Sequence, residues 1–122
     1  MEVQFLLPLP TETLKYLISF LLLCVKSMRK KDHVIVTEMI FHKGYDEVHE
    51  WLDECYTENL GFQHWKERHH LRAIEEKYGV GTIEYDVAVL HVLLDWVSHL
   101  NIYAVPADED EVELWLKDSM VW

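Results

Sequence analysis

Residues 61–79 read G-F-Q-H-W-K-E-R-H-H-L-R-A-I-E-E-K-Y-G and hold three of the eight histidines of the chain. Apolar side chains recur in this stretch at helical spacing, and a glycine stands at each end, as is typical of helix boundaries. The pattern predicts one helix over residues 61–79, with a mixed inner face: His64, Glu67, Leu71, Ile74 and Tyr78, with His70 at its edge. His69 is predicted to face roughly the opposite side, where it is either exposed to solvent or hydrogen-bonded to a metal ligand. A glutamate and a histidine on a buried face need partners, and a metal ion is one candidate.

The rest of the chain is also helical in pattern. Residues 1–10 form an extended lead-in that ends at two prolines, and 108–122 form a closing amphipathic helix. Further helices are expected to follow Thr11 and to span residues 44–59 and 85–101. Residues 33–42 suit either a strand or a helix, and we favour a helix because no second strand is evident to pair with it. The predicted fold is an all-α, compact, single-domain bundle of five or six helices over residues 1–122.

Composition and charge limit the partners. The chain has 122 residues, half of them hydrophobic, and a formal net charge of −11. Nucleic acids and anionic membranes attract basic surfaces, so neither is an expected partner. A basic protein surface or a divalent cation is compatible with this charge.

Cysteine usage and the apolar segments indicate a cytoplasmic protein. Cys24 and Cys55 form neither a disulfide framework nor a zinc-finger motif. The first ten residues lack the basic region of a signal peptide. The longest apolar stretch, residues 16–25, is about half the length of a membrane span.

Three predicted helices each carry a histidine and a carboxylate one turn apart. The pairs are His49 with Asp53, His64 with Glu67 (close to His70), and His91 with Asp95. Helix bundles that direct such pairs inward build metal sites, and Glu67-x-x-His70 has the spacing used in di-iron bundles. The candidate metal ligands are therefore His49, Asp53, His64, Glu67, His70, His91 and Asp95. Imidazole with carboxylate suits a divalent metal, with zinc preferred and iron or manganese as alternatives. Asp53 and Asp95 could instead accept a hydrogen bond from a liganding histidine.

Simpler interpretations of these residues stay open. Each pair could be a surface contact, His91, Asp95 and His99 could form the solvated stripe of a buried helix, and the histidines could be purely structural. The first functional hypothesis is a metal-binding helical protein, with metal-dependent hydrolysis as one reaction. The alternative is an acidic protein-interaction module, such as a phage-encoded inhibitor that docks on a basic host protein.

The order of the motifs resembles an uncharacterised family of small His-rich bacterial and phage proteins, classed only as a domain of unknown function. The motifs that carry the resemblance are V-H-E-W-L-D at residues 48–53, H-W-K-E-R-H-H at 64–70 and H-V-L-L-D at 91–95. His33 upstream, Pro106 and E-L-W-L at residues 113–116 follow the same order. The resemblance covers residues 32–116, and the first 31 have no counterpart in it. It implies a shared histidine and aspartate constellation without naming a reaction: His33, His49, Asp53, His64, His69, His70, His91 and Asp95.

Overall fold

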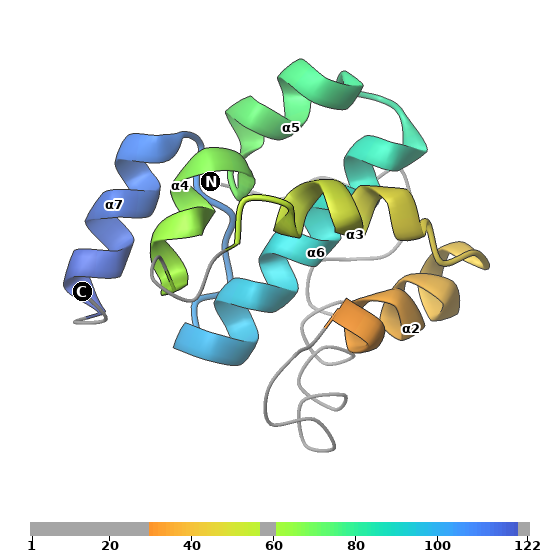
Figure 1. Ribbon diagram of the computed structural model, residues 1–122, viewed down its shortest axis with the longest axis horizontal. Coiled ribbons are helices and arrows are strands. Elements are labelled where there is room, and N and C mark those ends of the chain that lie inside the picture. The colour runs from red at the N-terminus through yellow and green to blue at the C-terminus, as the bar shows by residue number, and fades with distance from the viewer. Residues whose placement is uncertain (1–29, 57–60, 120–122) are drawn as a thin grey trace.

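The computed structural model describes residues 30–56 and 61–119, and every regular element in these ranges is a helix (Figure 1). The elements are α2 (Lys30–Phe41), α3 (Asp46–Asp53), the 3₁₀ helix η1 (Gly61–His64), α4 (Trp65–Arg68), α5 (Leu71–Tyr78), α6 (Ile83–Leu100) and α7 (Glu109–Asp118). The prediction of an all-α bundle is confirmed. The predicted lead-in over 1–10 and the helix after Thr11 lie outside the described residues, as do residues 120–122 of the predicted closing helix, and the described α7 ends at Asp118.

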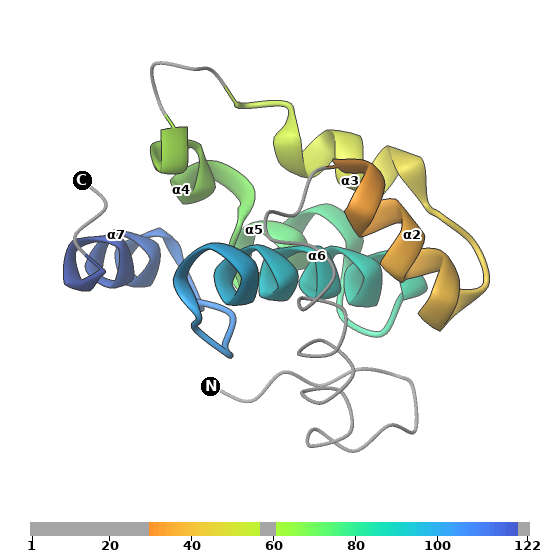
Figure 2. The ribbon, with the colours of Figure 1, turned by 90° about the horizontal axis from the view of Figure 1, so that it is seen from below.

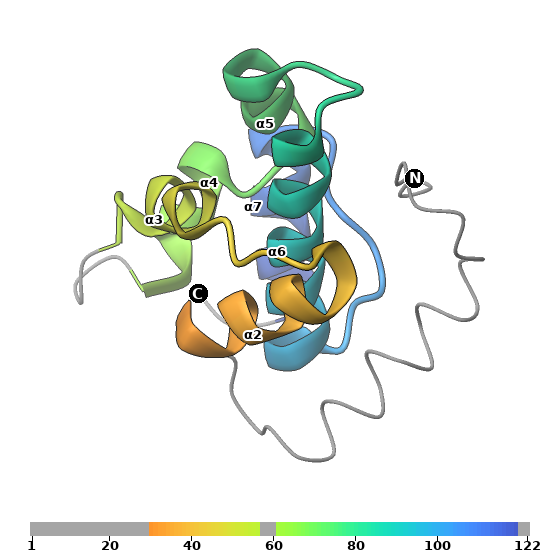
Figure 3. The same cartoon turned by 90° about the vertical axis from the view of Figure 1, so that its right-hand side faces the viewer.

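Helix α6 is the centre of the packing. All its residues from Asp86 to Val97 are buried, and α2, α3 and α5 each pack against it. The helix begins where the Thr82 hydroxyl accepts the Tyr85 amide at 3.1 Å, and it ends at Asn101 in the left-handed conformation. Figure 3 shows α5 beside the upper part of α6, with α2 crossing lower down.

Helices α2 and α3 pack on each other and on α6 (Figure 2). The helix favoured for residues 33–42 is confirmed, whereas the described α3 is shorter than the predicted helix over 44–59. The connection between them is tight at Gly44. A Cβ atom there would lie 2.9 Å from both Val34 Cγ1 and Asp46 Oδ1, so the absence of a side chain at Gly44 allows the close approach of the two helices.

The prediction of one continuous helix over residues 61–79 is wrong. The chain leaves the helical conformation at His69 and is extended at His70, which separates α4 from α5. The first amides of α5, on Leu71 and Arg72, donate to the carbonyls of Pro106 and Ala107, each at 2.9 Å. These acceptors come from a segment more than 30 residues away, so tertiary hydrogen bonds replace the intrahelical ones and stabilise the break.

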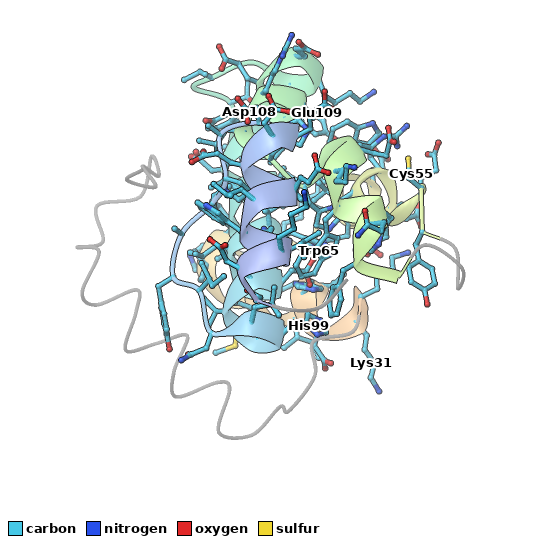
Figure 4. All side chains as sticks on the ribbon, turned by 90° about the vertical axis from the view of Figure 1, so that its left-hand side faces the viewer. Lys31, Cys55, Trp65, His99, Asp108 and Glu109 are labelled. Atoms are coloured by element: carbon cyan, nitrogen blue, oxygen red, sulfur yellow. The ribbon has the colours of Figure 1, made fainter. Side chains whose placement is uncertain are left out.

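Helix α7 closes the fold by packing against α4. Its start is a reciprocal cap, in which Asp108 accepts the Glu111 amide at 3.0 Å and Glu111 accepts the Ala107 amide at 2.7 Å. Figure 4 shows Asp108 and Glu109 at this end of α7. Among the described helices, none is long and apolar enough to cross a membrane.

Candidate metal centre

Four side chains from three parts of the chain converge beside α6. Asp53 comes from the end of α3, His69 from the break between α4 and α5, and His91 and Asp95 from successive turns of α6. One ligand atom from each lies within 4.8 Å of all the others. The shortest approaches are to Asp95 Oδ2, which lies 3.0 Å from His69 Nε2 and 3.2 Å from His91 Nε2. Asp53 Oδ1 lies 3.6 Å and 3.5 Å from the same two nitrogens.

These separations match the spacing of ligands around one ion. Nitrogen and oxygen ligands bind zinc at about 2.1 Å, which places neighbouring ligand atoms of a tetrahedral site about 3.4 Å apart. The four measured separations fall on either side of that value. Two imidazoles and two carboxylates also form a donor set that suits zinc, iron or manganese. The cluster can therefore hold a divalent cation.

A hydrogen-bond chain behind the cluster fixes the tautomer of His91. The Thr37 hydroxyl donates its proton to the His33 carbonyl at 2.7 Å, so its oxygen accepts from His49 Nε2 at 3.0 Å. The same Nε2 also donates to the Gly44 carbonyl at 3.1 Å. His49 Nδ1 is then the acceptor of the 2.7 Å bond from His91 Nδ1. His91 Nε2 is left to face the two carboxylates, 3.2 Å from Asp95 Oδ2 and 3.5 Å from Asp53 Oδ1. A metal-binding histidine typically has its second nitrogen held in this way.

The electrostatics of the cluster favour a cation. Burial lowers the pKa of His69 to about 4 against the opposing effect of Asp95, and burial together with His91 lowers that of His49 to about 3. Burial also opposes charge on His91, but Asp95 and Asp53 together raise its pKa to about 9. In the metal-free protein, a protonated His91 therefore partly neutralises the two carboxylates, whose pKa values are both lowered by the surrounding histidines despite burial. A divalent ion would supply the missing positive charge and replace that proton.

Contacts from α4 place His69 in the cluster. The Arg68 guanidinium donates to the Trp51 carbonyl at 2.7 Å and lies 4.9 Å from the centre of the Trp51 ring, so the end of α4 is anchored to α3. The Trp65 ring stacks on His69 with centroids 5.6 Å apart and also packs on Trp96 at 4.8 Å. His69 is thus fully buried, and of its two predicted positions the solvent-exposed one is wrong.

A cavity of about 570 Å³ opens onto the carboxylate side of the cluster. Its wall contains Asp53 and Asp95 from the cluster. The other lining residues are three histidines, three aromatic residues, a lysine and a glycine: His33, His64, His99, Tyr56, Phe62, Trp65, Lys30 and Gly61. Trp65 and His99 lie toward the same part of the molecule in Figure 4. Asp53 keeps a third of its side chain exposed, whereas His69 and His91 are fully buried. A bound ion would therefore be reached from the carboxylate side.

The structure brings together some of the predicted ligands and separates others. Asp53, His91 and Asp95 meet in the cluster, and His49 lies directly behind His91. His64 lines the cavity, where its Nδ1 donates to the Gly61 carbonyl at 2.6 Å. Glu67 is exposed on α4.

His70 is a helix cap in this structure. Its Nδ1 accepts the Ala73 amide at 3.3 Å and its Nε2 donates to the Lys66 carbonyl at 3.1 Å, so neither ring nitrogen has a spare lone pair. The residues that the spacing argument missed are His69 and His33. His69 was hidden by the assumption of a continuous helix, and His33 by the uncertain secondary structure of its segment. The family resemblance was the signal that singled out both.

Comparison with protein-family models, with curated proteins and with solved structures finds no match to this chain. The site is therefore interpreted from its own chemistry.

Proposed function

We propose that this protein is a divalent-metal-dependent hydrolase whose ion is bound by Asp53, His69, His91 and Asp95. The observation that carries the proposal is that four ligand atoms converge at a spacing that suits one metal ion, beside a cavity. Both carboxylates of the cluster, Asp53 and Asp95, line that cavity. A purely structural ion has no need of a cavity beside it, whereas a catalytic ion needs a position for water or substrate. With four protein ligands, that position would be a fifth one, on the side where Asp53 and Asp95 line the cavity.

The metal supplies Lewis acidity and lowers the pKa of water bound to it. Zinc is the preferred ion, with iron or manganese as alternatives, because the donor set mixes imidazole and carboxylate. His64 is the residue that we assign to proton transfer. Its Nδ1 proton is committed to Gly61, which leaves Nε2 as a lone-pair base on a residue that lines the cavity.

The family resemblance supports the same centre. Six of the eight residues that it singles out lie in or against the cluster: His33, His49, Asp53, His69, His91 and Asp95. They come from separate motifs, and their convergence is what a shared metal site in such a family would require. We propose that the purpose of those motifs is metal binding rather than helix packing alone.

Metal analysis of the full chain, purified without a tag or chelator, tests the binding step. We expect at least about one zinc, iron or manganese ion per chain, and a loss of more than about tenfold in affinity in Asp95→Asn. Glu67→Gln is the matched control, because this carboxylate is exposed and outside the cluster. A wild-type chain that binds no divalent metal would overturn the proposal and would favour the acidic interaction module instead.

The hydrolytic step needs its own assay. The metal-loaded protein is offered nitrophenyl phosphate monoesters, phosphate diesters and carboxylic esters, before and after chelation. We expect hydrolysis of one class that chelation and Asp95→Asn both abolish, with His64→Gln retaining metal but losing rate. Stoichiometric metal with no hydrolysis in any class would reject the hydrolase assignment and leave the metal site in place.

A further inference from the structure

The two carboxylate oxygens of Asp95 face different sets of histidines. Oδ2 points toward His69 and His91, which belong to the cluster described above. Oδ1 lies 2.9 Å from His33 Nε2 and 3.9 Å from His99 Nε2. Asp95 therefore has a second oxygen with histidines of its own, on α2 and on the last turn of α6.

We propose that the centre is dinuclear, with a second divalent cation bound by Asp95 Oδ1, His33 Nε2 and His99 Nε2. This inference rests on the proposed function, since Asp95 would bridge this ion to the one held by Asp53, His69 and His91. Carboxylate-bridged pairs of ions about 3.5–4 Å apart are a recurrent arrangement in metal-dependent hydrolases.

Each of the two nitrogens lies at a distance from Oδ1 that two ligands of one ion can have. Ligands bound at about 2.1 Å are separated by about 3 Å when they are neighbours and by at most about 4.2 Å when they lie opposite each other. The separation from His33 matches neighbouring ligands, and that from His99 lies within the upper limit.

All three proposed ligands of the second position line the cavity, whereas only the two carboxylates of the first position do. His33, Asp95 and His99 all line the cavity wall, whereas His69 and His91 are not among its lining residues. Three protein ligands leave further positions of the ion open toward this space, which is the arrangement expected of a catalytic rather than a structural ion. Lys30 also lines the cavity, but its ammonium is held by Glu50 at 3.0 Å.

The environment of His33 also fits a ligand. The side chain is 2% exposed, its ring stacks on His91 with centroids 3.9 Å apart, and its Nε2 is aimed at Asp95. The stack on His91 and the contact with Asp95 hold the His33 ring in place as a candidate ligand.

Titration of the metal-free full chain with Mn²⁺ tests the proposal, with bound ions counted by equilibrium dialysis and their coupling read by electron paramagnetic resonance. We expect two ions per chain and an exchange-coupled spectrum in the wild type. His99→Gln is the main variant because this side chain is partly exposed and outside the first cluster. It should bind one ion with an isolated six-line spectrum, and the affinity of the second ion should fall by at least about tenfold.

His33→Gln gives a second variant with the same expected result, and His42→Asn is the matched control on an exposed histidine of the turn after α2. One ion per wild-type chain, without coupling, would overturn the dinuclear centre while leaving the proposed function intact. No ion at all would overturn both. Two coupled ions in both His99→Gln and His33→Gln would show that these histidines are not the ligands of the second ion.

Discussion

The pKa of His91 predicts how metal affinity depends on pH. In the metal-free protein Asp95 and Asp53, acting against burial, raise this pKa to about 9, so the ring carries a proton at pH 7. The first metal ion must displace that proton from Nε2. His69, with its pKa lowered to about 4 chiefly by burial, has already lost its proton at pH 6 and releases none. We therefore expect one proton to be released per first ion bound.

The magnitude follows from that single proton. Below the pKa of His91, the affinity for the ion should rise about tenfold per pH unit, which is about 1.4 kcal/mol per unit. Between pH 6 and pH 8 the gain is about a hundredfold, and it should level off as the pH passes about 9. If the histidines kept their ordinary pKa near 6.5, the affinity would rise more steeply below pH 6.5 and stay constant above about pH 7.5.

Isothermal titration calorimetry with Mn²⁺ measures both quantities, in buffers of different ionisation enthalpy at pH 6, 7 and 8. The expected result is one proton released at each pH and a continued tenfold gain from pH 7 to pH 8. An affinity that is constant over this last interval would refute the assignment of the proton to His91.

Three further predictions concern stability and the support of the centre. In the metal-free protein, thermal stability should be highest near pH 6.5: the contribution of His91 is lost as pH rises toward about 9, and that of His49 and His69 is lost as pH falls toward 3–4. Scanning calorimetry checks this, and added metal should remove the alkaline decline. His49→Phe should weaken metal binding by about 10–100-fold because it removes the acceptor of the His91 Nδ1 proton, and unchanged affinity in dialysis would contradict this role. Gly44→Ala should destabilise the fold by about 1–3 kcal/mol in urea denaturation, since its Cβ would contact Val34 at 2.9 Å, and wild-type stability would argue against such close packing of α2 on α3.

Local patterns were sufficient for the helices whose ends and faces are set by neighbouring residues. The Asp108 cap of α7 and the apolar α6 could both be predicted because capping and burial leave a signature within a few residues. The pairing of His91 with Asp95 followed from the one-turn spacing, and the structure shows the two side chains 3.2 Å apart.

The break in residues 61–79 could not be found in this way. It depends on carbonyls of Pro106 and Ala107, which are distant in sequence and accept the first amides of α5. The error mattered for the site because the break turns His69 inward and gives His70 the capping role. On a continuous helix these adjacent residues point in different directions, and the pattern predicts His70 as the inward one.

X-ray absorption spectroscopy of the metal that the full chain retains tests the central claim most directly. The account predicts a shell of nitrogen and oxygen ligands at about 2.0–2.2 Å with imidazole scattering from at least two histidines. That scattering should weaken in His69→Gln and stay unchanged in Glu67→Gln. A sulfur shell at about 2.3 Å, or a chain that retains no metal, would contradict a centre built from Asp53, His69, His91 and Asp95.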